Sequence, residues 1–361
     1  MKVVKTLIGI LVVLFILVVL AVLFLYNYGT KPYDKKNKEK VQVEIPAGST
    51  YYSIGDILYT NKLIKSKLIY KVYLKMHTPS EELKAGYYEL SQSMSLEEII
   101  DTLERGGVST NPDEITITFK EGLNMRAIAK VIATNTNNTE EDVFNLLKDK
   151  KYLSGLIEKY WFIDKSILDD EIYYPLEGYL FPNTYNFKNK DVTVEEIFEV
   201  MLDEMQKQLD PYKDEISKSD YTVHEILTMA SIVELEALNK NDRKTVAGVF
   251  YNRLRAHMSL GSDVTTYYAS GVDMGERDLY VSELQAVNAY NTRSSSMAGK
   301  LPVGAICNPS ISSIEAAIIP TKTSYLYFVA DKNGKVYYTK SNAEHEKKIA
   351  ELKAKNLWYE Y

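Results

Sequence analysis

The sequence predicts an α+β protein with an N-terminal transmembrane helix ahead of its folded body. A long apolar run without charged residues opens the chain, and short alternating apolar patterns in the body predict strands. Helical patterns lie between these strands without the regular strand–helix alternation of a doubly wound sheet. With 361 residues, the chain is long enough for more than one domain, so we expect several modules.

The apolar run extends from Leu7 to Leu25 and contains no charged or strongly polar residue. At about 1.5 Å rise per residue, a helix of this length spans close to the hydrocarbon core of a bilayer. The run ends in bulky residues, including Tyr26 and Tyr28, where a cleavage site would need small ones. We therefore predict that residues 1–26 form a short cytoplasmic segment and an uncleaved anchor.

The orientation of this anchor follows from the lengths of the flanking segments. Lys2 and Lys5 precede the run and Lys31, Lys35 and Lys36 follow it, so the positive-inside rule is nearly balanced. The N-terminal tail is short, whereas the long body contains no second apolar span. We predict a single-pass protein of the cell membrane with a cytoplasmic N-terminus and an extracytoplasmic body.

Composition shifts divide the remaining chain into a linker and three parts. Residues 27–40 are rich in lysine and asparagine and predict a solvated linker. A strand–turn–helix pattern begins at Val41 and recurs near Ile115, which indicates two related small units. We predict a first module at 41–107, a second strand–turn–helix module at 108–168 and a larger mixed α+β domain at 169–361.

The large domain begins with a run rich in tyrosine, proline and glycine, which predicts loop or short strand. Long helices are predicted at residues 193–208 and 222–238, and a third from 242 past 254. Near the C-terminus, residues 325–329 predict a strand followed by a hairpin turn at 331–334.

Composition argues against several classes of function. The formal net charge of −6 provides no electrostatic footprint for nucleic acid. Cys307 is the only cysteine, so neither an intramolecular disulfide nor a cysteine metal cluster can form. The four histidines lack metal-ligand spacing, so we expect no metal and no cofactor.

Glu234 interrupts an apolar stripe on the helix predicted at 222–238. At about 100° per residue, the stripe contains Val223, Ile226, Leu227, Ala230, Val233, Ala237 and Leu238. The same spacing places Glu225 and Glu236 on the opposite, polar side. Burial of a carboxyl group disfavours its charged form and raises its pKa, which suits a general acid. The pattern is equally compatible with a buried ion pair between Glu234 and Arg243, Arg253 or Arg255.

The string of residues 230–236, Ala-Ser-Ile-Val-Glu-Leu-Glu, resembles the signature of the MltG (YceG-like) family of endolytic murein transglycosylases. Further family blocks resemble residues 177–185, 249–254, 260–265, 290–292 and 325–331, in that order. The chain departs from the family pattern at Asn183, Gly261, Val264, Arg293, Val336 and residues 299–306.

The resemblance implies a LysM-like module at 41–107 and a YceG-like catalytic domain at 169–361. It also implies cleavage within nascent peptidoglycan strands, between N-acetylmuramic acid and N-acetylglucosamine, leaving 1,6-anhydro ends and terminating glycan elongation. In this interpretation Glu234 is the catalytic acid and then base, and cell-wall synthases and divisome or elongasome proteins are the expected partners. The implied substrate-binding residues are Glu177, Asn183, Tyr185, Asn252, Arg253, Ser262, Asp263, Thr265, Tyr290 and Asn291.

Two other functions are compatible with these residues. A hydrolase of the usual type needs a second carboxylate across the scissile bond, for which Asp263 is the nearby candidate. The other possibility is a membrane-anchored scaffold that binds peptidoglycan without catalysis. A scaffold gives no reason for a carboxylate in an apolar stripe, so Glu234 favours an enzyme.

Overall fold

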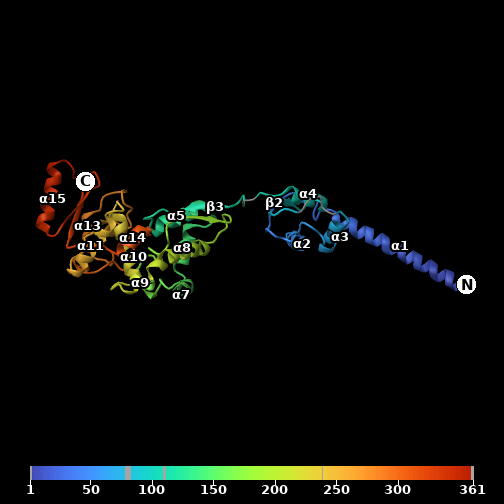
Figure 1. The fold of residues 1–361 in the computed structure, drawn as a ribbon, viewed down its shortest axis with the longest axis horizontal. Helices are drawn as coiled ribbons and strands as arrows, with labels where there is room; N and C mark the ends of the chain where they lie inside the picture. Colours follow the sequence, from blue (N-terminus) through green and yellow to red (C-terminus); the bar gives the residue numbers. More distant parts are fainter. Residues whose placement is uncertain (1, 78–82, 109–110, 238, 359–361) are drawn as a thin grey trace. The chain divides into compact units, whose positions relative to one another are not determined.

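The computed structural model describes residues 2–77, 83–108, 111–237 and 239–358 (Figure 1). The chain forms two compact units, Met1–Glu114 and Ile115–Tyr361. Both combine helices with small antiparallel sheets, which confirms the predicted α+β class. Leu238, the last member of the predicted apolar stripe, lies outside the described residues.

The first unit begins with the long helix α1, Lys2–Thr30. Within the described residues, its segment Gly9–Thr30 is the one helix long and apolar enough to cross a membrane. Its apolar side chains from Ile10 to Leu20 are exposed. The predicted helix is therefore present, and it continues five residues beyond Leu25.

The remainder of the first unit packs three short helices against a two-stranded sheet. Strands β1 and β2 are antiparallel, with Val43 opposite Tyr88. Side chains of Thr50, Ser66 and Ser95 accept hydrogen bonds from backbone N–H groups at the starts of the three helices. A core of its own stabilises the unit. The elements are β1 Lys40–Ile45, α2 Tyr51–Thr60, α3 Lys67–Met76, β2 Gly86–Ser91 and α4 Leu96–Arg105.

The second unit is mainly helical and contains two small sheets. Strand β3 pairs with β4, and strand β5 forms a hairpin with β6. The elements are β3 Ile115–Thr118, α5 Met125–Asn135, α6 Glu140–Leu146, α7 Lys150–Lys159, β4 Thr184–Phe187, α8 Val194–Leu209, α9 Lys213–Ser217, α10 Val223–Glu236, α11 Arg243–Arg255, α12 Asp263–Ala269, α13 Val281–Leu284, α14 Ile311–Ile318, β5 Tyr327–Ala330, β6 Val336–Thr339 and α15 Asn342–Ala354.

Residues 115–168 do not form a separate module, contrary to the boundary predicted at residue 168. Strand β3 pairs with β4, so Ile117 lies opposite Tyr185. Ile117 and Phe119 belong to the same hydrophobic core as the residues of α8 and α10. The recurring strand–turn–helix pattern showed the local elements correctly, but periodicity does not specify the strand with which β3 pairs.

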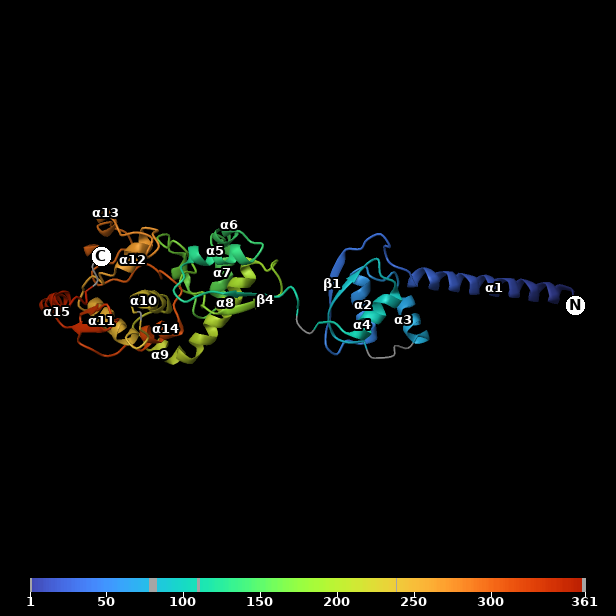
Figure 2. The same ribbon diagram turned by 90° about the horizontal axis from the view of Figure 1, so that it is seen from above.

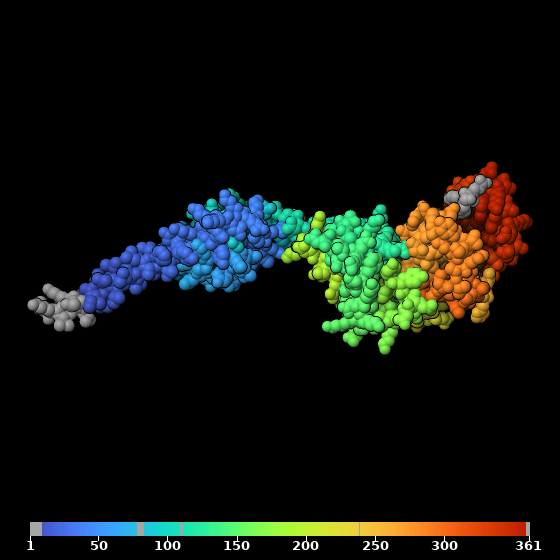
Figure 3. Space-filling view, turned by 180° about the vertical axis from the view of Figure 1, so that it is seen from behind, coloured from blue at the N-terminus to red at the C-terminus, as the bar shows by residue number. Residues whose placement is uncertain are grey.

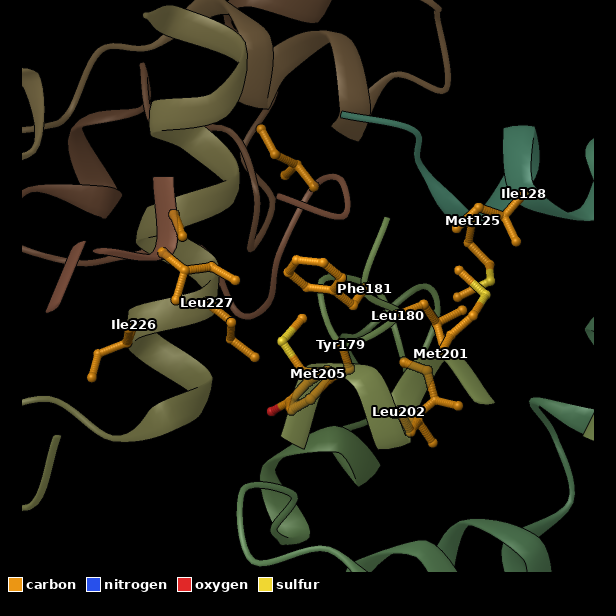
Figure 4. Close-up of a cluster of buried hydrophobic side chains, with 14 of the residues drawn as sticks. Met125, Ile128, Tyr179, Leu180, Phe181, Met201, Leu202, Met205, Ile226 and Leu227 are labelled. Carbon is orange, nitrogen blue, oxygen red and sulfur yellow. The ribbon is translucent and has the colours of Figure 1, made fainter. Parts of the chain in front are cut away.

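Helix α10 runs through the centre of the second unit. It packs against α11, α12 and α14, and nine of its residues from His224 to Val233 are buried. Figure 4 shows Phe181 and Met205 gathered beside Leu227 of α10. Thr222 caps the helix and forms a capping box with Glu225. This packing leaves little of α10 facing solvent.

The C-terminal hairpin and α15 lie beside α11, at the end of the second unit away from β3 and β4 (Figures 1 and 2). In the space-filling view, the orange segment that follows α11 adjoins the red C-terminal segment (Figure 3). Residues of both segments line one cleft together with Leu235 and Glu236 of α10.

Candidate active site

A cleft of about 720 Å³ opens at the C-terminal end of α10 in the second unit. Glu236, Arg253, Ser262, Asp263 and His345 are among the residues that line it. A second cavity of about 320 Å³ shares Leu235, Val264, Tyr267 and Met274 with this cleft. The two cavities therefore adjoin, and their volumes are typical of small-ligand sites.

Glu236 is the carboxylic acid that α10 presents to the cleft. The hydroxyl of Ser262 donates a hydrogen bond of 2.5 Å to its Oε1. Burial raises the pKa of Glu236 above its ordinary value, although the Ser262 hydrogen bond opposes this. The negative charge of Asp263 raises that pKa as well, whereas Arg253 lowers it. The cleft therefore holds a carboxyl group that retains its proton more readily than one in water.

This position of Glu236 contradicts the polar side that helical spacing predicted for it. The prediction assumed that α10 has one apolar and one solvent-exposed face. Helices α11, α12 and α14 instead pack against α10, so its C-terminal end is partly buried and faces the cleft. The polar groups around Glu236 belong to the cleft.

Glu234 lies in a buried ion pair, the other arrangement compatible with its place in the apolar stripe. Its Oε1 accepts a hydrogen bond of 2.8 Å from Nη2 of Arg243, and both side chains are 6% exposed. Its Oε2 accepts hydrogen bonds from the backbone N–H of Ser310 at 2.9 Å and from its Oγ at 2.6 Å. Glu234 thus ties α10 to α11 and to the start of α14, and it is not among the residues that line the cleft.

Arg253 joins two walls of the cleft, consistent with its predicted place in the site. Its Nε donates to the carbonyl oxygen of Leu326 and its Nη1 to that of Leu260, both at 2.6 Å. The guanidinium lies 5.0 Å from the ring centre of Tyr327. These contacts hold the C-terminal hairpin next to the loop that carries Ser262.

Ser262 and Asp263 also lie in the cleft, where Asp263 pairs with Arg293 at the surface. Thr265 does not reach a ligand, because it is fully buried and its hydroxyl donates to the carbonyl oxygen of Ser262 at 2.8 Å. Asn291 is also buried and accepts a hydrogen bond of 2.8 Å from Thr266. Thr265 and Asn291 therefore hold the Ser262 loop in place, which corrects their prediction as binding residues.

Glu177 is buried in the core and is 3% exposed, so it is inaccessible to a substrate. Its Oε2 accepts hydrogen bonds from the Met125 N–H at 2.8 Å and the Tyr268 hydroxyl at 3.1 Å. Its Oε1 accepts one of 3.0 Å from Nδ2 of Asn308. Burial raises the pKa of Glu177 to about 8. The prediction of Glu177 as a binding residue is therefore wrong, and its contacts are structural.

Four other predicted binding residues do not line the cleft. Asn183 is exposed beside β4, and the buried hydroxyl of Tyr185 donates to the Phe181 carbonyl oxygen at 2.7 Å. Nδ2 of Asn252 donates to the carbonyl oxygens of Thr323 and Tyr325, at 2.9 and 2.8 Å. Tyr290 is buried against Tyr173 and Tyr268. Asn252 therefore ties α11 to the segment before β5, and Tyr290 packs against α12.

His345 of α15 lines the cleft, although no sequence pattern pointed to it. Its ring stacks on Tyr327, with ring centres 5.3 Å apart. Its Nδ1 is buried and makes no hydrogen bond to the described residues. Burial lowers the pKa of His345, which favours a neutral ring. A residue so far along the chain from Glu236 could be placed in the site only by the tertiary fold.

In the parts of the chain that the structure describes, no three or more histidine, cysteine, aspartate or glutamate residues are grouped so that they could hold a metal ion. The polar side chains that line the cleft carry carboxyl, hydroxyl, guanidinium and imidazole groups.

Residues 43–351 match the model of the YceG-like family. An endolytic murein transglycosylase of Bacillus subtilis (strain 168) is 38% identical over 326 residues, which cover 90% of this chain and 88% of that protein. One from Streptococcus pneumoniae serotype 2 (strain D39 / NCTC 7466) is 37% identical over 335 residues, covering 89% of this chain and 60% of the relative. The crystal structure of a protein described as YceG-like, from Listeria monocytogenes, has a TM-score of 0.60 and 38% identity, covering 86% of this chain and 99% of that one.

We predict that Glu177 makes the stability of the second unit depend on pH. Its pKa rises from an ordinary 4.5 to about 8 on folding, so the folded state keeps a proton that the unfolded state loses. The free energy of unfolding should therefore fall as pH rises from 4.5 to about 8. Urea unfolding across this range should show a shallower fall for Glu177→Gln than for the wild type. Glu121→Gln, at an exposed position, is the control and should keep the wild-type slope. Equal slopes in all three proteins would contradict this account.

Proposed function

The chain belongs to the YceG-like family, and from this premise we propose that it is an endolytic murein transglycosylase, a lyase that cleaves the glycan strands of peptidoglycan internally. Relatives with this name cover about nine-tenths of the chain. A carboxyl group with a raised pKa at the wall of a cleft supports acid–base chemistry on such a polymer.

We propose that Glu236 is the catalytic acid and then the base. As an acid, it donates its proton to the glycosidic oxygen between N-acetylmuramic acid and N-acetylglucosamine as that bond breaks. As a base, it takes the proton from the 6-hydroxyl of the muramoyl residue, whose oxygen bonds to the anomeric carbon. The proton returns to Glu236, no water is consumed and the product carries a 1,6-anhydro end. One carboxyl group is enough because the acid and base steps follow each other.

We assign the catalytic role to Glu236 and not to Glu234, the residue that the sequence suggested. The two carboxylates differ in the groups that donate hydrogen bonds to them. Both oxygens of Glu234 accept hydrogen bonds, from Arg243 and Ser310, and the residue is not part of the cleft lining. Glu236 has a hydrogen bond from Ser262 on Oε1 and lines the cleft. In this proposal Glu234 holds in position the helix that presents Glu236.

Hydrolysis is the second candidate, with Asp263 activating a water molecule. Asp263 lines the same cleft and acts electrostatically on Glu236. Hydrolysis requires the Asp263 carboxylate to act as a base, but this carboxylate is paired with Arg293. This pairing favours transglycosylation, and the chemistry of the product ends distinguishes the two reactions.

In this proposal the first unit places the enzyme at the membrane and binds glycan. Helix α1 anchors the protein as a single-pass span with a cytoplasmic N-terminus, and the LysM-like module binds glycan beside the membrane. Cleavage near the membrane acts on newly made strands and so terminates their elongation. Cell-wall synthases and proteins of the divisome or elongasome are the partners expected at this location.

Glu236→Gln should lose about two to four orders of magnitude in turnover, because it removes the transferable proton while retaining the side-chain shape. Its melting temperature should stay near that of the wild type. Glu234→Gln is the matched variant on the same helix and should lower the melting temperature by roughly 10 °C, since breaking a buried ion pair costs about 3–5 kcal/mol.

The assay digests purified glycan strands and analyses the products by mass spectrometry, with melting followed in parallel. Retained turnover in Glu236→Gln, together with a stable but inactive Glu234→Gln, would return the catalytic role to Glu234. Reducing ends in place of 1,6-anhydro ends would show hydrolysis. Absence of cleavage by the wild-type protein would favour the scaffold.

Asp263→Asn should move the alkaline limb of the activity profile to lower pH. The negative charge of Asp263 raises the pKa of Glu236, so its removal lowers that pKa and the acid loses its proton earlier. The measurement is kcat/KM against pH for the wild type and the variant. Asp214→Asn, on the exposed face of α9, is the control and should leave the limb unchanged. A shift to higher pH in Asp263→Asn would refute this electrostatic role.

The first unit without its anchor, residues 31–114, should bind purified cell wall without cutting it, because it has its own core and resembles a glycan-binding module. Sedimentation with insoluble wall measures this binding. Residues 115–361 should sediment more weakly than residues 31–361. If residues 31–361 bind wall and residues 31–114 do not, the LysM-like assignment is wrong.

A further inference from the structure

Helix α3 carries an apolar stripe on its outer surface. Leu68, Val72 and Met76 are 69%, 36% and 66% exposed, and their spacing of four residues places them on one face. The opposite face carries Tyr70, which is buried in the core of the first unit. Adjacent large apolar side chains left in water indicate an interaction surface.

A row of lysines runs beside this stripe. Lys67, Lys71 and Lys75 have the same spacing of four residues and are exposed. The segment from 61 to 77 contains five lysines and no acidic residue. The Lys67 ammonium lies 2.7 Å from Asp56, and that of Lys71 lies 4.5 Å from the ring centre of Tyr52. The surface therefore combines an apolar stripe with a row of exposed lysines, of which Lys67 is paired with Asp56.

Helix α3 packs against the end of α1 as well as against α2. A Cβ atom at Gly29 would lie 2.7 Å from Cγ1 of Ile69, so the absence of a side chain lets the two helices approach closely. Further along α3, the His77 ring nitrogen Nδ1 lies 3.4 Å from the Tyr26 hydroxyl. Ile69 and His77 are eight residues apart, but they contact α1 residues only three apart, so α3 crosses the end of α1 beside the apolar span, and Figures 1 and 2 both show it at that end.

We propose that α3 lies in the outer headgroup layer of the membrane that α1 spans and binds anionic phospholipids. Leu68, Val72 and Met76 contact the boundary of the acyl chains, while the lysine row binds lipid phosphate groups. A helix with these two faces is suited to a membrane interface, where lysine stems lie along the apolar surface and their ammonium groups reach the phosphates. This inference rests on the anchor of the proposed function.

Three observations favour a lipid surface as the partner of the α3 face. The apolar stripe adjoins the helix that would leave the membrane, Tyr26 and His77 mark the interface level, and the lysines match anionic headgroups. As a result, the first unit has a fixed orientation at the membrane and does not swing freely about α1. The LysM-like module is then held at the level where new glycan strands emerge.

The test uses the full chain in vesicles, with a polarity-sensitive fluorophore attached to a cysteine introduced by Val72→Cys. The native Cys307 is buried with a raised pKa, so it labels slowly. In vesicles containing phosphatidylglycerol, we expect a blue-shifted probe that is quenched at least twofold by lipids carrying a quencher near the headgroup. The same label at Asp101→Cys, an exposed position on α4, is the control and should remain unquenched.

Lys71→Gln combined with Lys75→Gln should reduce the quenching at position 72 in phosphatidylglycerol vesicles but not in pure phosphatidylcholine. The proposal would be overturned if the probes at positions 72 and 101 reported equal exposure to water. It would also be overturned if the quenching at position 72 did not depend on Lys71 and Lys75. A signal that disappears on dilution to one chain per vesicle would assign the surface to a second copy. Extraction of the vesicles with carbonate tests separately whether α1 anchors the protein, so failure of the anchor is distinguished from failure of α3 to bind. Glycan cleavage is assayed in the same samples, which tests the proposed enzymatic function independently.

Discussion

The packing of α10 against α11, α12 and α14 is the constraint on which the proposed site depends. Because three helices cover α10, its polar side chains reach solvent only where the fold leaves an opening. The cleft at the C-terminal end of α10 is such an opening. The ion pair between Glu234 and Arg243, together with the hydrogen bonds from Ser310, fixes the neighbouring elements around that end. An ion pair with both side chains buried is costly to break, which keeps the helix in one position.

Two glutamates in one helix therefore have different environments although they are only two residues apart. Glu234 is bound by an arginine and a serine, whereas Glu236 has one serine hydroxyl on Oε1 and lines the cleft. Burial and the charge of Asp263 raise the pKa of Glu236. Separate environments for chemically identical side chains are a common way to divide structural and catalytic tasks.

A second buried network supports the adjoining cavity. Asn308 donates to the Leu123 carbonyl oxygen and to Glu177, and its Oδ1 accepts from the N–H groups of Gly178 and Leu180. Three segments far apart in sequence thus meet at one side chain. At Gly178, a backbone φ of 87° and a Cβ position only 2.4 Å from Ala305 leave room for glycine alone. Residues 177–180 are therefore buried and shape the core.

The sequence by itself determined the α+β class, the apolar helix, most long elements, the family and the helix that carries the proposed acid, because these depend on local periodicity and ordered motifs. Three of the residues that it predicted to bind substrate, Arg253, Ser262 and Asp263, line the cleft. Only the tertiary structure decided that β3 pairs with β4, that Glu177 is buried and that His345 reaches the site. The choice between Glu234 and Glu236 also needed the structure, because helical spacing gives the angle between two side chains but not which neighbours cover each one.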